Sequence, residues 1–274
     1  MKYSPIDINN NLKKYDFNFK KKFGQNFITD ENIIDSIINK ADIMDDTLVI
    51  EVGPGSGSLT YKLCTKAKQV VCFEIDVTLK DVLSNNLKEF DNVDIIYEDF
   101  LKVDLSQILK RYNYKHLHLI ANLPYYITTP IITKLIDDKI AMDKIVVMVQ
   151  KEVGSRFTAR PNSKDYNSLS IFLQYNFNIK KLMDISRNVF IPRPNVDSII
   201  VEFTKKEKLP VNNLDLFYSL VKDSFVQKRK TLRNNLKKYD LLIIEDVLKK
   251  YGYDLNVRAE QLDIEVFIDI SNNL

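Results

Sequence analysis

Short apolar runs alternate with amphipathic segments through the first half of the chain. The runs at 48–52, 70–75, 93–97, 117–121 and 145–149 predict strands. The segments at 57–66, 77–89, 104–111 and 129–138 predict helices, and a helix over 31–41 would begin at a cap supplied by Thr29 or Asp30. This alternation is typical of a mostly parallel sheet connected by helices, the α/β class.

The pattern changes after residue 150. Residues 170–177 and 198–203 are rich in β-forming side chains, which predicts antiparallel strands that close the sheet. After the charged run at 205–208 the sequence has helical periodicity to its end. We therefore predict an α/β domain over 1–207, with a basic N-terminal arm over 1–28, and a small all-helical domain over 208–274.

Composition narrows the class of protein. Of the 274 residues 45% are hydrophobic, which excludes a disordered chain, and no apolar run approaches the ~18 residues of a membrane span. The N-terminus lacks the apolar core of a signal peptide, so a soluble, cytoplasmic protein is expected. Cys64 and Cys72 have neither disulfide nor zinc spacing, so we expect buried thiols and no metal site.

Three of the six glycines, Gly53, Gly55 and Gly57, lie in one loop between the first predicted strand and the helix after it. Such a loop lets a ligand approach backbone N–H groups closely. Glu74 lies at the end of the next strand, where a carboxylate can accept hydrogen bonds from ribose hydroxyls, so an adenosine-type ligand is favoured. Asp76 is an alternative ribose ligand, or only a helix cap.

The charge beside this loop distinguishes between adenosine ligands. Glu51 would repel the pyrophosphate of a dinucleotide but would suit the ammonium and sulfonium groups of S-adenosylmethionine. After the third predicted strand, Glu98-Asp99-Phe100 offers a carboxylate to the adenine amino group, with Phe100 available to pack on the adenine ring. The sequence therefore favours S-adenosylmethionine over NAD as the cofactor.

The string Asn122-Leu123-Pro124-Tyr125-Tyr126 follows the fourth predicted strand and would meet the same crevice. The exocyclic amine of adenine is a poor nucleophile because its lone pair is delocalised into the ring. The Asn122 oxygen and the backbone carbonyl before Pro124 could accept its two N–H bonds, while Tyr125 stacks on a flipped base. An Asn-Pro turn with two core tyrosines is the structural alternative.

Ordered motifs along most of the chain resemble one enzyme family. They are Lys21-Lys-Phe-Gly-Gln-Asn-Phe27, the glycine-rich loop, Phe73-Glu-Ile-Asp76, Asn122-Leu-Pro-Tyr125, Gln150-Lys-Glu-Val153, Phe190-Ile-Pro-Arg-Pro-Asn-Val-Asp-Ser198, Phe225-Val-Gln-Lys-Arg-Lys-Thr-Leu-Arg-Asn-Asn-Leu236 and Arg258-Ala-Glu-Gln-Leu262. Over roughly residues 15–265 the chain resembles the small-subunit rRNA adenine N6,N6-dimethyltransferases, the kasugamycin-sensitivity family. The chain departs from the family at Phe23, where leucine is common, and at 161–167, where asparagines replace the usual glycines.

This resemblance implies a Rossmann-like class I methyltransferase domain with a small helical C-terminal domain. It implies dimethylation of two adjacent adenosines near the 3′ end of small-subunit rRNA in an immature subunit, by a monomer. Motif positions place the cofactor at Gln25, Asn26, Phe27, Glu51, Gly53, Gly55, Gly57, Glu74, Ile75, Asp99, Phe100 and Asn122. The target adenine falls at Asn122, Leu123, Pro124 and Tyr125, with Phe190 on its other face.

Positive charge is clustered although the net charge is only +3. On a single helical wheel, Lys222, Arg229, Lys230, Arg233 and Lys237 fall within an arc of about 100°. Such a face suits RNA phosphates, and Lys20, Lys21 and Lys22 form a second candidate, with solvated surface as the alternative for both.

Two other functions fit the same residues. One is the large-subunit rRNA adenine methyltransferase of the macrolide-resistance type, which shares the catalytic motifs. The other is a non-catalytic RNA-binding assembly factor, against which Glu51, Glu74, Asp99 and Asn122 argue because all four positions keep the residues that catalysis would need.

Overall fold

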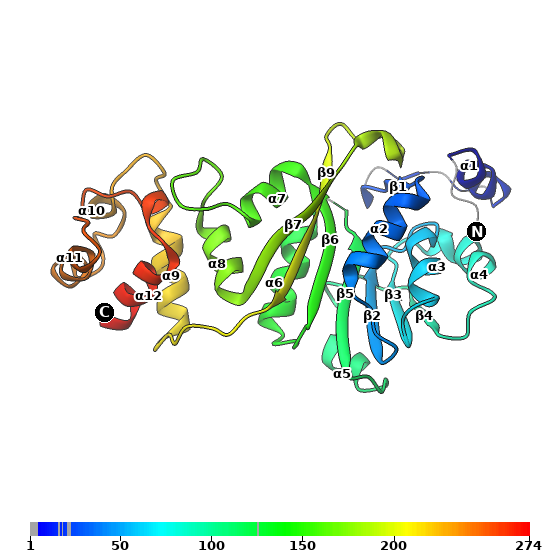
Figure 1. Ribbon diagram of the computed structural model, residues 1–274, viewed down its shortest axis with the longest axis horizontal. Helices are drawn as coiled ribbons and strands as arrows, with labels where there is room; N and C mark the ends of the chain where they lie inside the picture. Colours follow the sequence, from blue (N-terminus) through cyan, green and yellow to red (C-terminus); the bar gives the residue numbers. More distant parts are fainter. Residues whose placement is uncertain (1–4, 16, 18, 21–22, 125) are drawn as a thin grey trace. The chain divides into compact units, whose positions relative to one another are not determined.

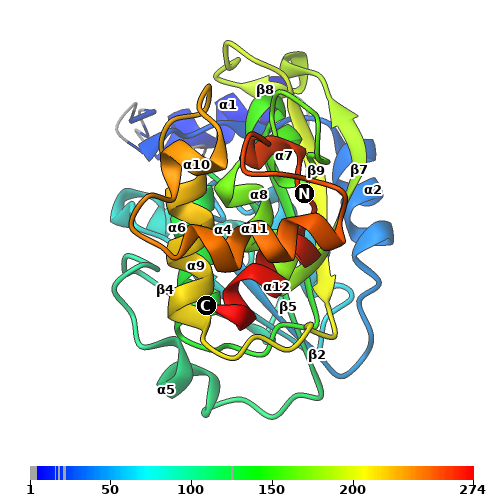
Figure 2. The ribbon, with the colours of Figure 1, turned by 90° about the vertical axis from the view of Figure 1, so that its left-hand side faces the viewer.

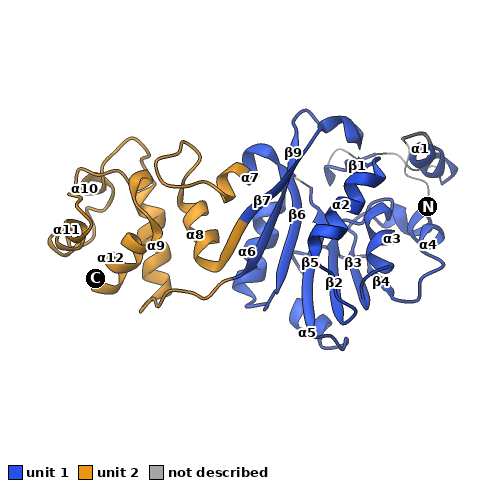
Figure 3. Cartoon of the chain, in the orientation of Figure 1, with its two compact units in different colours: residues 1–154, 180–205 blue, residues 155–179, 206–274 orange. Residues whose placement is uncertain are grey.

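The computed structural model describes residues 5–15, 17, 19–20, 23–124 and 126–274 (Figure 1). The chain forms two compact units, one of residues 1–154 and 180–205 and one of residues 155–179 and 206–274 (Figure 3). The predicted α/β class is confirmed, with a mostly parallel sheet in the first unit and helices in the second.

The sheet contains seven strands in the order β4-β3-β2-β5-β6-β9-β7. Its strands are β2 (Thr47–Val52), β3 (Gln69–Phe73), β4 (Val93–Ile96), β5 (His116–Asn122), β6 (Lys144–Gln150), β7 (Phe177–Ile185) and β9 (Ser198–Lys205). Strands β2 to β6 pair in parallel, and β9 pairs antiparallel with β6. All six residues of β2 are buried, as expected for a central strand covered on both faces.

The helices of this unit are α1 (Pro5–Lys14), α2 (Glu31–Ala41), α3 (Ser58–Cys64), α4 (Lys80–Asn86), α5 (Leu105–Leu109), α6 (Thr128–Asp137) and α7 (Lys151–Phe157), which runs into the second unit. Helices α2 to α6 correspond to the predicted ones, whereas α1 and α7 were not predicted. The Asp30 side chain caps α2 by accepting a hydrogen bond from the Asn32 N–H, which decides between the two predicted caps. Ile34, Ile37 and Ala41 of α2 pack into one core with strand residues.

The strand predicted over 170–177 is wrong, because residues Ser168–Asn176 form helix α8. Ile171, Leu173 and Tyr175 are all buried, and their period of two imitated a strand. A capping box stabilises the start of this helix. Asn167 Oδ1 accepts a hydrogen bond from the Ser170 N–H, and Ser170 Oγ accepts one from the Asn167 N–H. The strand beside β9 is β7, which starts where α8 ends.

The second unit has its own core. Its further helices are α9 (Leu214–Ser224), α10 (Leu232–Asn235), α11 (Leu241–Lys250) and α12 (Ile264–Asn273); α11 and α12 lie side by side, as Figure 2 shows. Tyr175 packs its ring 5.0 Å from that of Phe217, and Tyr166 donates to the Leu262 carbonyl at 3.1 Å. The compact units therefore differ from the predicted division at 207/208, because residues 155–179 share the core of the C-terminal helices.

Among the described residues, no helix is long and apolar enough to span a bilayer. No cluster of three or more histidine, cysteine, aspartate or glutamate side chains suited to a metal ion occurs in the same part of the chain. Cys64 and Cys72 are both buried free thiols, as predicted.

Candidate active site

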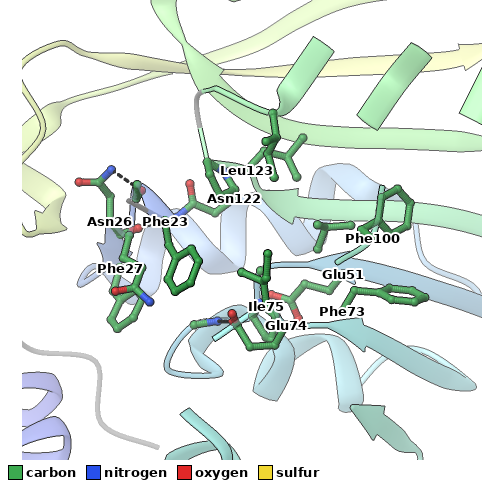
Figure 4. Close-up of a pocket in the computed structure, with 18 of the residues that line it drawn as sticks. Phe23, Asn26, Phe27, Glu51, Phe73, Glu74, Ile75, Phe100, Asn122 and Leu123 are labelled. Atoms are coloured by element: carbon green, nitrogen blue, oxygen red, sulfur yellow. Dashed lines mark hydrogen bonds between the residues drawn. The ribbon is translucent and has the colours of Figure 1, made fainter. Parts of the chain in front are cut away.

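A cavity of about 260 Å³ opens at the carboxyl ends of β2, β3 and β5. Figure 4 shows Phe23, Asn26 and Phe27 on one side of it and Phe73 and Phe100 on the other. The predicted residues that line it are Gln25, Asn26, Phe27, Glu51, Gly53, Gly55, Glu74, Ile75, Asp99, Phe100, Asn122, Leu123 and Pro124. These residues span almost 100 positions of the sequence. The sheet brings them together because the carboxyl ends of its parallel strands meet at one edge.

Two of the described residues predicted for the site are not among those that line the cavity. Gly57 caps α3, and a Cβ there would lie 3.2 Å from a Leu83 methyl group. Phe190 is 3% exposed and packs in the core, where its backbone lies opposite Ile28 in the pairing of β1 (Phe27–Ile28) with β8 (Phe190–Ile191). Its stacking on a target base stays a prediction. Tyr125 lies outside the described residues.

Several lining residues had no place in the sequence prediction. Phe23, Gly24 and Ile28 flank the predicted Gln25–Phe27, and Tyr126, which is 57% exposed, follows the predicted Tyr125. The signal for Phe23 and Gly24 was their position inside the motif at 21–27, which Ile28 follows directly. The signal for Tyr126 was its place in the string at 122–126, which was predicted to meet the crevice.

The glycine-rich loop is shaped by close packing. Gly55 adopts φ +60°, and a Cβ at this position would lie 2.6 Å from Cε1 of Phe27. Its N–H donates to Glu74 Oε2 at 3.2 Å, and the Gly53 N–H donates to the Phe73 carbonyl at 2.9 Å. The loop therefore joins the ends of β2 and β3 and leaves space for a ligand against its backbone.

We expect Gly55→Ala to weaken binding of S-adenosylmethionine at least about tenfold, because the new methyl group displaces the Phe27 ring and strains a left-handed residue. Isothermal titration calorimetry measures the effect. The matched control is Gly252→Ala, which carries the same kind of strain at φ +76° but meets nothing within 4 Å. Equal cofactor affinity in the two variants would contradict this prediction.

Two carboxyl groups beside the loop are buried. Glu51 is 1% exposed and accepts from Thr60 Oγ1 at 2.6 Å; Glu74 is 4% exposed and accepts from the N–H groups of Asp76 and Gly55. Burial raises the pKa of Glu51 to about 8 and that of Glu74 to about 7, although these hydrogen bonds oppose the shifts. A cationic ligand at Glu51 would restore the ionised form.

Asn122 ends β5 and contacts the N-terminal side of the cavity. Its Nδ2 donates to the Asn26 carbonyl at 2.7 Å. The side-chain oxygen Oδ1 is therefore the atom of this amide that can accept a hydrogen bond from a target amine. The same loop continues into buried Leu123 and then Pro124, whose Cδ lies 3.8 Å from the position of a Cβ on Gly53.

Asp76 does not line the cavity. It caps the short 3₁₀ turn Val77–Leu79 by accepting from the Thr78 N–H, and it also accepts from Lys20 Nζ at 2.6 Å and Gln25 Nε2 at 2.9 Å. Of the two ribose candidates, Glu74 is the one at the cavity. Lys20, predicted to contact RNA, has a partner within the chain; Lys21 and Lys22 lie outside the described residues.

The single helix assumed for the basic segment after residue 221 is wrong. Helix α9 ends at Ser224, the chain turns, and α10 begins at Leu232. Asn235 holds the turn, since its Nδ2 donates to the Ser224 carbonyl at 2.7 Å and its Oδ1 accepts from the Gln227 N–H. The cations predicted to contact RNA are exposed but lie on different segments: Lys222 on α9, Arg229 and Lys230 on the turn, Arg233 on α10 and Lys237 after it.

Comparison with known proteins gives consistent matches. The sequence profile of the family described as ribosomal RNA adenine dimethylase matches residues 16–274. "Ribosomal RNA small subunit methyltransferase A" of Bacillus pumilus is 45% identical over 282 aligned positions, covering 99% of this chain and 96% of the relative. The protein of that name from Oceanobacillus iheyensis is 43% identical, with 95% and 92% covered.

Solved structures agree in fold. A dimethyladenosine transferase from Plasmodium falciparum superposes with a TM-score of 0.76 at 26% identity, covering 89% of this chain and 95% of that one. The 23S rRNA methyltransferase ErmE reaches 0.72 at 24% identity, covering 90% and 99%, and supports the fold. With a family profile that spans nearly all of its length and relatives above 40% identity, the chain belongs to the ribosomal RNA adenine dimethylase family.

Proposed function

We propose that this protein transfers methyl groups from S-adenosylmethionine to N6 of two adjacent adenosines near the 3′ end of small-subunit rRNA. The observation that carries the proposal is the position of Asn122, whose amide lies on the same cavity as Glu74 and Asp99. Adenine N-methylation requires a hydrogen-bond acceptor for the target amine and carboxylates that bind adenosine, all on one cavity.

The residues fit the cofactor. The backbone at Gly53 and Gly55 allows close approach, and the cavity is lined by the Glu74 carboxyl at the predicted ribose position and by Asp99 and Phe100 at the predicted adenine position. Glu51, below the loop, would face the cationic methionine end. When bound, S-adenosylmethionine supplies a methyl group made electrophilic by the adjacent sulfonium.

Asn122 and its loop orient the target amine. Asn122 Oδ1 and the Leu123 carbonyl accept its two N–H bonds, which turns the nitrogen lone pair away from the adenine ring and toward the methyl group. The hydrogen bond from Nδ2 to the Asn26 carbonyl fixes the amide in this orientation. The rate then comes from positioning for direct in-line transfer, without a covalent enzyme intermediate or a dedicated general base.

The alternatives are less well supported. The relatives at 43–45% identity carry small-subunit names, whereas the large-subunit methyltransferase is 24% identical and shares the fold. A non-catalytic assembly factor would have no need of a cavity lined by Glu51, Glu74, Asp99 and Asn122.

We further propose that the enzyme acts in the cytoplasm as a monomer and without a metal ion. Its substrate is an immature subunit, whose rRNA phosphates contact Arg229, Lys230, Arg233 and Lys237.

The decisive experiment offers the purified protein immature small subunits and immature large subunits, each with isotopically labelled S-adenosylmethionine. Mass spectrometry of nuclease digests then locates dimethyladenosine. The proposal requires N6,N6-dimethyladenosine at two adjacent positions of small-subunit rRNA only. Label in large-subunit rRNA would favour the macrolide-resistance activity, and cofactor binding absent by calorimetry would favour the non-catalytic factor.

Cofactor affinity is expected to rise with pH through Glu51. In the ligand-free site its pKa is about 8, so at pH 6 the carboxyl is protonated, and a cation binds it better once the proton leaves. Calorimetry at pH 6 and pH 8.5 on the wild type and on Glu51→Gln isolates this effect, because titration of the cofactor itself is common to both. We expect the wild type to bind the cofactor about tenfold more tightly than Glu51→Gln at pH 8.5, and the difference in affinity to be much smaller at pH 6. A constant ratio would mean that Glu51 does not sense the cofactor's charge.

A further inference from the structure

Asp76 has more hydrogen-bond partners than a helix cap needs. Its side chain is 1% exposed. Oδ1 accepts from Lys20 Nζ at 2.6 Å and from the Thr78 N–H and hydroxyl at 3.1 and 2.6 Å, and Oδ2 accepts from Gln25 Nε2 at 2.9 Å. Capping accounts only for the contact with the Thr78 N–H. The bonds from Lys20 and Gln25, more than 50 residues away in sequence, need another explanation.

The carboxylate is ionised in this setting. Burial acts to raise the pKa of Asp76, but the hydrogen bonds from Lys20, Thr78 and Gln25 outweigh it and hold the pKa below its usual value. Lys20 Nζ also donates to Thr78 Oγ1 at 2.9 Å, so the ammonium is held at two points. A partly buried, charge-assisted contact of this geometry is stronger than an exposed surface ion pair.

These bonds hold residues that line the cofactor cavity. Gln25 is fixed at both ends of its amide, since Oε1 accepts from the Lys20 N–H at 2.8 Å while Nε2 donates to Asp76. The Lys20 ammonium lies 5.9 Å from the centroid of the Phe23 ring, within cation–π range. Phe23 and Gln25 both belong to residues 23–28, which we name the N-terminal wall because every one of them lines the cavity.

The other end of the N-terminal wall is anchored separately. Asn122 Nδ2 donates to the Asn26 carbonyl, and Phe27 and Ile28 form β1, which pairs with β8. Only the end at Phe23 and Gln25 depends on Asp76. Asp76 is also coupled to the predicted ribose ligand, because its own N–H donates to Glu74 Oε1 at 2.8 Å.

We propose that Asp76 is a positioning residue that fixes the N-terminal wall through Lys20 and Gln25, and that this contact retains the bound cofactor. The inference rests on the proposed function, since it takes the ligand of the cavity to be S-adenosylmethionine or its product S-adenosylhomocysteine. Asp76 makes no contact with the ligand itself. It keeps the phenylalanine and glutamine of the wall at the cavity, so its effect falls on cofactor dissociation rather than on methyl transfer.

Asp76→Asn provides the sharpest test. Asparagine keeps an oxygen for the Thr78 N–H and therefore the cap, but it removes the charge facing Lys20 and presents an NH₂ group to Gln25 Nε2. Gln25 cannot turn its amide without losing the bond from the Lys20 N–H. We expect S-adenosylhomocysteine to dissociate about tenfold faster, measured by stopped-flow competition. The KM for S-adenosylmethionine should rise by a similar factor, whereas kcat at saturating cofactor changes far less.

Two further variants make the result specific. Lys20→Met removes the same ion pair from the other side and should reproduce the faster dissociation even where Asp76→Asn folds poorly. Asp104→Asn changes another aspartate cap, which accepts from the Gln107 N–H on α5, and should leave dissociation unchanged. Wild-type dissociation rates in both Asp76→Asn and Lys20→Met would overturn the inference. Failure of the wild type to bind S-adenosylhomocysteine at all would instead overturn the proposed function.

Discussion

Replacement of Asn122 by alanine is expected to slow methyl transfer by about 100-fold to 1,000-fold, the usual loss when one preorganised polar group at a reacting centre is removed. The acceptor matters most as the amine rehybridises, so the loss falls on the chemical step. Single-turnover kinetics on pre-bound small subunits at saturating S-adenosylmethionine measure it. We expect a second, smaller effect on cofactor affinity, because alanine also removes the hydrogen bond to the Asn26 carbonyl.

Asn122→Asp separates the two roles. Aspartate keeps an oxygen that accepts from the target amine but has no N–H for the Asn26 carbonyl. We expect it to bind cofactor as weakly as Asn122→Ala while it retains much more of the transfer rate. If both variants transfer methyl groups at nearly the wild-type rate, lone-pair orientation is wrong and Asn122 serves only as an anchor for Asn26.

The quadruple variant in which Arg229, Lys230, Arg233 and Lys237 become alanine is expected to lose most of its affinity for the subunit while its cofactor affinity stays intact. Each lost phosphate contact lowers the slope of log affinity against log salt by about 1. Filter binding or fluorescence anisotropy across a salt series measures the slope. The four side chains are exposed on the turn after α9 and around α10.

A matched control removes four exposed lysines from the first unit: Lys66, Lys68, Lys110 and Lys139. The change in net charge is the same, so a non-specific electrostatic effect would lower the slope equally in both proteins. A slope lowered only in the quadruple variant locates the RNA contact. An unchanged slope in that variant would make the basic segment an ordinary solvated surface.

Patterns that depend on near neighbours were read correctly from the sequence. The buried run of β2, the start of α2 at residue 31 and the glycine-rich loop follow from side-chain periodicity and local backbone preference. The site at the strand ends follows too, because parallel strands bring Glu74, Asp99 and Asn122 to one edge whatever the details of packing. The sequence by itself therefore determined the α/β class and the place of the glycine-rich loop and of Asn122 at one edge of the sheet.

Tertiary structure decided the features that depend on distant partners. Ile171, Leu173 and Tyr175 are buried at every second position, yet they belong to a helix, in which Ile171 and Tyr175 pack into the core of the second unit. The helix expected through residue 237 breaks because Asn235 bonds back to Ser224. Lys20 reaches Asp76 across 56 positions of the sequence. Such contacts have no local signature, since they arise only when packing brings the partners together and burial makes an unpaired polar group costly.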